Sequence, residues 1–176
     1  RPPVLGVGSV VVALGIPGVG KSRVISEFSK RASEAGMRVR VLNFGAVMLE
    51  EAASRSMSLK RDELRRLPLR VQRELQESSA ARISEQRQES DITVIDTHLI
   101  VRSKGGYLLG LSRKMLEKMR PDVLAVVVAP PEQIQGRRAR GVKRQRDALD
   151  LRSIEVEQDI TMYVAFALAA ECDSNV

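Results

Sequence analysis

One segment constrains the fold of this chain more than any other: residues 15–22, which read GIPGVGKS. The order of glycine, four residues, glycine, lysine and serine matches the phosphate-loop pattern. An apolar run at 7–14 precedes the segment, and a helical pattern at 22–35 follows it. At the start of a helix, free backbone N–H groups point toward an anion, and glycines let the backbone curl around it. The sequence therefore predicts a loop that binds phosphate groups between a buried strand and a helix.

This loop is expected to hold a nucleoside triphosphate. Lys21 would place its ammonium group on the β and γ phosphates, and the Ser22 hydroxyl is the type of ligand that Mg²⁺ takes in such a loop. The remaining residues expected to line the triphosphate are Gly15, Ile16, Pro17, Gly18, Val19, Gly20 and Arg23.

A second motif ends an apolar strand with a carboxylate. Residues 91–98 read DITVIDTH, so Asp96 follows the strand expected at 92–95. Such an aspartate alone usually caps a turn or helix; beside a phosphate loop it is the expected partner of Mg²⁺, directly or through water. His98, two residues later, either positions a phosphate or satisfies a turn, and the sequence leaves both readings open.

Alternation of strands and helices predicts an α/β fold with a central parallel sheet covered on both faces. Three strands are short, apolar and rich in valine and isoleucine, as buried parallel strands are; a fourth alternates more and is expected nearer an edge. The buried strands are expected at 7–14, 92–95 and 123–129, and the edge strand at 38–44. Helices are expected at 22–35, 46–55, 62–89 with an interruption at Pro68, 113–119, 131–140 and 151–171.

Composition narrows the class of protein. The chain has 176 residues, which fits a single domain, and its one cysteine excludes an intramolecular disulfide. The net charge of +7 favours phosphate-bearing partners, whereas 3% aromatic residues offer few platforms for stacking nucleic-acid bases. A nucleotide is therefore expected rather than a polynucleotide. No apolar run reaches the length of a membrane span, so a cytoplasmic location is expected.

Two charge-rich segments, at 55–73 and 137–152, interrupt the pattern of strands and helices. They are either solvated helix surface or flaps that close on phosphates. Phosphoryl transfer needs positioned positive charge on the transferring group, and one arginine can supply about 10³ to 10⁵ in rate. The second segment contains such candidates, which include Arg138, Arg144 and Arg146.

In these motifs the chain resembles the archaeal adenylate kinases, a branch of the nucleoside monophosphate kinases. The resemblance extends from about residue 10 to 170. It rests on the phosphate loop, VLNFGAVM at 41–48, RDELRRL at 61–67, VIDTH at 94–98, GYLLGL at 106–111, and the arginines of the second charge-rich segment.

The resemblance implies a P-loop kinase fold of three layers, α/β/α, that transfers a phosphoryl group from ATP to AMP with Mg²⁺. It also implies an AMP-binding flap at about 46–75 and a short lid at about 136–148. Asn43, Gly45, Arg65, Tyr107 and Gly110 would form the AMP site, to which we add His98, and Arg138, Arg144 and Arg146 the charge clamp of the lid. Family members are often trimers, so the resemblance also implies a homo-oligomer.

The chain departs from the family pattern at several positions. Gly141 and Lys143 replace an aspartate and a threonine of the usual lid, and Glu157, Thr161 and Met162 stand where histidine, asparagine and arginine are typical. The printed sequence ends where the family's last strand should begin, so that strand is expected to be missing, through truncation or as a variant with weaker base recognition.

Two other functions remain open from the sequence. The phosphate loop also fits a kinase for another nucleotide or a small metabolite. A regulatory or RNA-associated ATPase would use the basic surface to bind a polyanion, which a steep salt dependence would reveal.

Overall fold

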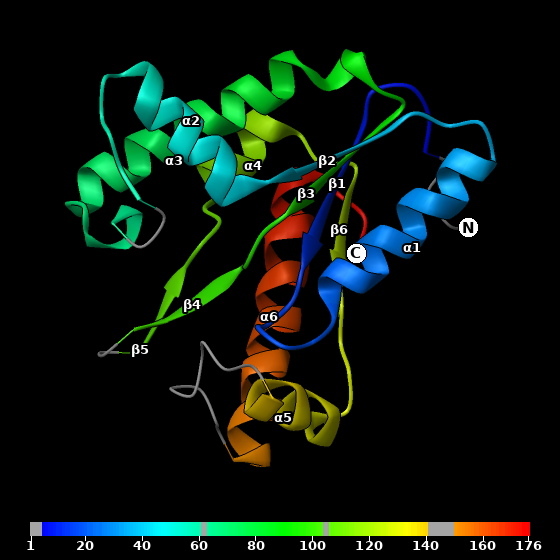
Figure 1. Cartoon of the computed structure of the whole chain (residues 1–176), viewed down its shortest axis with the longest axis vertical. Coiled ribbons are helices and arrows are strands. Elements are labelled where there is room, and N and C mark those ends of the chain that lie inside the picture. Colours follow the sequence, from blue (N-terminus) through cyan, green and yellow to red (C-terminus); the bar gives the residue numbers. More distant parts are fainter. Residues whose placement is uncertain (1–4, 61–62, 104–105, 141–149) are drawn as a thin grey trace.

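A four-stranded parallel sheet forms the centre of the protein (Figure 1). The computed structural model describes residues 5–60, 63–103, 106–140 and 150–176. The strands β1 (Ser9–Leu14), β2 (Val39–Asn43), β3 (Ile92–Asp96) and β6 (Val123–Val126) lie in the order β2-β3-β1-β6. All neighbouring pairs are parallel. The predicted strands are confirmed, and the strand expected near an edge is indeed the edge strand β2.

In the described part of the chain, six α-helices lie around the sheet, each close to its predicted range. The long helix predicted at 62–89 is divided, because Pro68 lacks an N–H group and α3 begins directly after it. Side-chain caps begin α2, α4 and α6. The helices are α1 (Lys21–Glu34), α2 (Phe44–Ser54), α3 (Leu69–Glu85), α4 (Arg113–Met119), α5 (Pro131–Arg140) and α6 (Leu151–Cys172), with 3₁₀ turns η1 (Leu64–Arg66) and η2 (Arg87–Glu89).

Alternate residues of β1 enter two separate cores. Val10, Val12 and Leu14 pack in the larger core with α2, α3, α4 and α6, whereas Val11 and Ala13 pack against α1. Full burial of each such aliphatic side chain contributes about 1.5 to 3 kcal/mol. Figure 1 shows α1 on one side of the strands and α2, α3 and α4 on the other. The arrangement has the three α/β/α layers expected.

A hairpin outside the main sheet was not predicted. The strands β4 (Ile100–Ser103) and β5 (Gly106–Leu109) pair antiparallel and extend away from the sheet (Figure 1). Sequence reasoning treated this region only as a motif, because two four-residue strands give too short a periodicity to recognise. On β5, Leu108 and Leu109 are exposed.

The predicted lid overlaps a helix. Residues 136–140 are the last turns of α5, and the remainder of the predicted lid, with Gly141, Lys143, Arg144 and Arg146, lies outside the described residues. The predicted flap at 46–75 consists of most of α2, η1 and the start of α3, apart from residues 61–62. In the part of the chain that is described, no helix combines the length and apolar character needed to cross a membrane.

Residues near the end of the chain lie beside β6. Asn175 forms an isolated parallel bridge with Val123. The Leu124 N–H donates to the Asn175 carbonyl at 2.8 Å, and the Asn175 N–H donates to the Asp122 carbonyl at 3.0 Å. A short parallel pairing therefore continues the sheet beyond β6.

Candidate phosphate-binding site

The loop at 15–20 connects the carboxyl end of β1 with the start of α1, as predicted. Gly20 occupies the N-cap of α1 with φ of 97°, a left-handed conformation that favours glycine. No side chain caps this helix, and its first turn carries no acidic residue. The N–H groups at the start of α1 therefore face a position that suits an anion.

Three side chains from two other segments, α5 and the residues after β3, bind carbonyl groups of this loop. His98 Nδ1 lies 2.9 Å from the Gly15 oxygen, Arg138 Nε donates to the Pro17 oxygen at 2.9 Å, and Arg137 Nη1 donates to the Val19 oxygen at 2.8 Å. These contacts fix the orientation of the loop's peptide groups. For His98, one ring nitrogen therefore binds the phosphate loop itself.

Lys21 and Asp96 form an ion pair between the loop and the end of β3. Lys21 is only 7% exposed and also donates to the Thr97 carbonyl at 2.8 Å. Asp96 lies in register with Ala13 of β1 and Asn43 of β2. Asn43 Nδ2 donates to the other carboxylate oxygen of Asp96 at 3.2 Å. The parallel strands thus bring three predicted site residues, Lys21, Asp96 and Asn43, together at the carboxyl ends of the strands.

The donor set near the loop fits Mg²⁺ that is shared with a nucleotide. Asp96 supplies a half-buried carboxylate and Ser22 an exposed hydroxyl at the start of α1. Among the described residues, no cluster of three or more His, Cys, Asp or Glu side chains is placed to hold a metal ion. Mg²⁺ usually binds through one or two carboxylates together with substrate phosphates, rather than in a cage of protein ligands.

The residues expected at the AMP site are placed on three elements. Asn43 caps α2, because its side chain accepts the Ala46 N–H at 3.2 Å, and Gly45 lies in the first turn of that helix. Tyr107 lies on β5, partly exposed. Arg65 belongs to η1, and its side chain is outside the described part.

Gly110, the last of the predicted AMP-site residues, lies directly after β5. Its N–H donates to the Leu99 carbonyl at 2.8 Å. A Cβ atom at this position would collide with the backbone carbonyl of His98. Glycine is therefore required for the hairpin to pass close to the residue that holds the phosphate loop.

Arg138, which was expected in the charge clamp of the lid, is buried. It lies on α5, is 7% exposed, and pairs with Glu157 of α6 at 3.0 Å. Its guanidinium contacts the phosphate loop through the Pro17 carbonyl. Arg138 thus belongs to the part of the predicted lid, residues 136–140, that is helical.

Sequence reasoning missed three residues around the loop. Arg137 lies in the second charge-rich segment but was not singled out, Glu157 was noted only as a departure from a family pattern, and Gln158 was given no role. Gln158 exchanges two hydrogen bonds with the backbone of Ala129, at 2.9 and 3.0 Å. A signal was present in the sequence: Glu157 lies on the same helical face as Ile154 and Thr161, which are buried.

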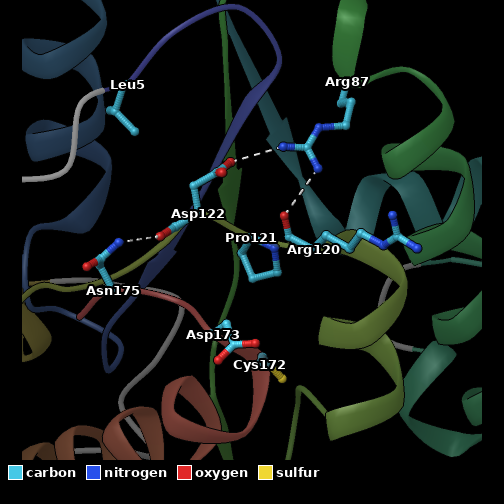
Figure 2. A pocket seen from close by; sticks show the side chains of 8 residues that line it. All are labelled: Leu5, Arg87, Arg120, Pro121, Asp122, Cys172, Asp173 and Asn175. Atoms are coloured by element: carbon cyan, nitrogen blue, oxygen red, sulfur yellow. Dashed lines mark hydrogen bonds and ion pairs between the residues drawn. The ribbon is translucent and has the colours of Figure 1, made fainter.

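A pocket at the opposite end of the strands is separate from this site (Figure 2). Its volume is about 460 Å³, and it lies at the amino end of β6. Within it, Arg87 donates to Asp122 Oδ2 at 3.1 Å and to the Arg120 carbonyl at 3.3 Å. The same Asp122 oxygen accepts the Val10 N–H at 2.7 Å. These contacts tie η2 to β1 and β6 and have a structural role.

Comparisons with known proteins agree with this geometry. A family model described as an AAA domain matches residues 14–155. The chain is 39% identical to adenylate kinase of Pyrococcus furiosus and 40% identical to that of Thermococcus onnurineus, in both cases over 95% of this chain and 83% of the relative. It is 38% identical to adenylate kinase of Methanopyrus kandleri over 96% of this chain and 87% of the relative. A chain with this phosphate loop and relatives of this similarity belongs to the adenylate kinase family.

Proposed function

We propose that this protein catalyses the reversible transfer of a phosphoryl group from ATP to AMP, which gives two molecules of ADP. The observation that carries the proposal is the meeting of Lys21, Asp96 and Asn43 beside the phosphate loop. Lys21 and Asn43 each bind one carboxylate oxygen of Asp96, which supports a site where the donor-phosphate lysine and a residue of the expected AMP side meet at one carboxylate. The names of the relatives support the identity of both nucleotides.

The donor phosphates bind at the start of α1. The loop's carbonyl groups are already bound by His98, Arg137 and Arg138, so its peptide groups are held before any ligand arrives. A preorganised set of donors stabilises developing charge without reorganisation during the reaction. Residues Gly15, Ile16, Pro17, Gly18, Val19, Gly20 and Arg23 form or border this cradle.

Lys21 exchanges partners when the nucleotide binds. Its ammonium group is paired with Asp96, which keeps both charges compensated in a partly buried place. Donor phosphates compete for Lys21, and Asp96 together with Ser22 would hold Mg²⁺. When bound, that ion neutralises charge on the phosphate oxygens.

AMP binds at the carboxyl ends of the strands, on the side where α2 and the β4–β5 hairpin lie. Asn43 and Gly45 lie at the start of α2, and Tyr107 and Gly110 lie at β5. Arg65 of η1 would hold the AMP phosphate, because a guanidinium matches phosphate oxygens with two parallel donors. Arg144 and Arg146 would complete the clamp on the transferring group.

A coupled assay of ADP formation tests the reaction. Purified protein with ATP and Mg²⁺ is given AMP, GMP, CMP or UMP, beside a reaction without acceptor. We expect ADP formation that depends on AMP and exceeds that with each of the other acceptors. Another preferred acceptor would replace AMP in the proposal, and ATP hydrolysis without acceptor dependence would indicate an ATPase. An inactive Lys21→Ala variant serves as the control for contaminating kinase.

A further inference from the structure

A buried ion pair lies beside the phosphate loop. Arg138 Nη2 and Glu157 Oε2 are 3.0 Å apart, and their side chains are 5% and 7% exposed. The pair joins α5 to α6. It is distinct from the exposed pairs within single helices, such as Arg152 with Glu155.

The same guanidinium is bound to the loop itself. Arg138 Nε donates to the Pro17 carbonyl at 2.9 Å. Its Cγ atom lies so close to Gly18 that a Cβ there would be only 3.0 Å away. Because the guanidinium is planar and its donors are fixed relative to one another, holding Nη2 also determines where Nε points. Glu157 thereby orients the guanidinium that binds the Pro17 carbonyl.

A buried pair of this kind is a weak source of stability. Removal of two charges from water costs much of what their attraction returns, and apolar residues of similar volume often replace such a pair without loss of stability. Stability alone therefore gives little reason for this pair, whereas a need for its fixed geometry does. Here the geometry fixes a peptide group of the loop that cradles the donor phosphates.

The neighbouring residue on α6 strengthens the link. Gln158 binds both the N–H and the carbonyl group of Ala129, after β6. Thr161, one turn later, donates its hydroxyl to the Glu157 carbonyl at 2.8 Å and is buried. This part of α6 is thus fixed to the end of the sheet from which the loop leaves.

We propose that Glu157 is a positioning residue for the donor nucleotide. It holds Arg138 so that the Pro17 carbonyl stays bound and the loop's N–H groups stay directed at the phosphates. This inference rests on the proposed function for its kinetic consequence, but donor binding alone tests it. It predicts that the affinity for ATP can fall without a loss of folding stability.

The test uses a double variant that keeps the core filled. Arg138→Met with Glu157→Leu replaces the pair by apolar side chains of similar volume. We expect a melting temperature close to that of the wild type, but an affinity for ATP, measured by calorimetry without AMP, that is about 10- to 100-fold weaker. The KM for AMP should change less than twofold. Glu155→Gln, a change of an exposed carboxylate on the same helix, should leave both nucleotides unaffected.

A single variant checks the direction of the effect. Glu157→Gln retains an acceptor for Arg138, so it should bind ATP with an affinity between those of the wild type and the double variant. The proposal is overturned if the double variant is stable and binds ATP like the wild type. It is also overturned if ATP and AMP weaken equally, in step with a loss of stability. Wild-type protein that binds ATP but transfers nothing to AMP would overturn the proposed function and leave the positioning role intact.

Discussion

Asn43 and Asp96 lie in register at the ends of β2 and β3, and the amide of Asn43 donates to the Asp96 carboxylate at 3.2 Å. The amide oxygen of the same Asn43 caps α2. One side chain therefore joins the helix on the expected AMP side to the carboxylate that pairs with Lys21. Substitutions at Asn43 can therefore separate the effect of the α2 cap on stability from the effect of the contact with Asp96 on activity.

Asn43→Ala removes both contacts, whereas Asn43→Asp removes one. A lost N-cap costs about 1 kcal/mol, which lowers the melting temperature by about 2 to 4 °C in a chain of this size. Aspartate preserves the cap but places a second carboxylate beside Asp96. We expect Asn43→Asp to retain the wild-type melting temperature more closely and yet lose more activity. Equal losses of activity and stability in the two variants would contradict the double role.

Lys21→Ala should lower kcat by about 10²- to 10³-fold or more, because it removes a donor aimed at the transferring phosphates. The half-buried Asp96 loses its ionic partner, although Asn43 still binds it. We therefore expect a folded protein, to be checked by circular dichroism and thermal melting alongside turnover. A folded variant with near-normal turnover would remove Lys21 from the mechanism.

Arg65→Ala should raise the KM for AMP by at least about tenfold, since a charged hydrogen-bond donor to phosphate is lost. The KM for ATP should change much less. Arg66, the next residue of η1 and exposed, gives a matched control, and Arg66→Ala should affect neither nucleotide strongly. Equal effects of Arg65→Ala on both nucleotides would place this arginine elsewhere.

Two glycine-to-alanine changes should shift stability in opposite directions. At Gly110 the new Cβ meets the His98 carbonyl, and this overlap should cost about 1 to 3 kcal/mol. At Gly136, inside α5, a new Cβ would have the end of the Arg140 side chain, 3.9 Å away, as its nearest neighbour. Because glycine loses more conformational freedom in a helix than alanine, Gly136→Ala should raise the free energy of unfolding by about 0.5 to 1 kcal/mol. Denaturant unfolding of both variants measures the difference. A neutral Gly110→Ala would mean that the hairpin can move away from His98.

Cys172 should react slowly with alkylating reagents. Burial, with a smaller effect of the nearby Glu117 carboxylate, raises the pKa of this thiol above its ordinary value. Since the thiolate is the nucleophile, its fraction at pH 8 is lower than for a free cysteine. Iodoacetamide should modify the native protein more slowly than the unfolded protein at that pH. A faster native reaction would show that the thiolate is favoured instead.

Local sequence determined the phosphate loop, the four parallel strands and the position of Asp96. Each depends on consecutive residues: glycines and lysine at fixed spacing, apolar runs of strand length, and a carboxylate directly after such a run. Pro68 likewise marked the start of α3, because its missing N–H group acts on its own helix. The prediction that ATP and AMP are the substrates came from the family resemblance, and relatives of about 39% identity support that resemblance.

Tertiary structure decided which side chains support that loop. His98 reaches Gly15 across 83 residues of chain, and Arg138 reaches Pro17 across 121. No local pattern encodes such contacts, since they exist only once the sheet brings β1 beside β3 and α5 packs on α6. The role of Glu157 changed most: on the sequence it was a departure from a pattern, and in the fold it is the buried partner of an arginine. A buried charge needs a partner, and only packing determines which residue supplies it.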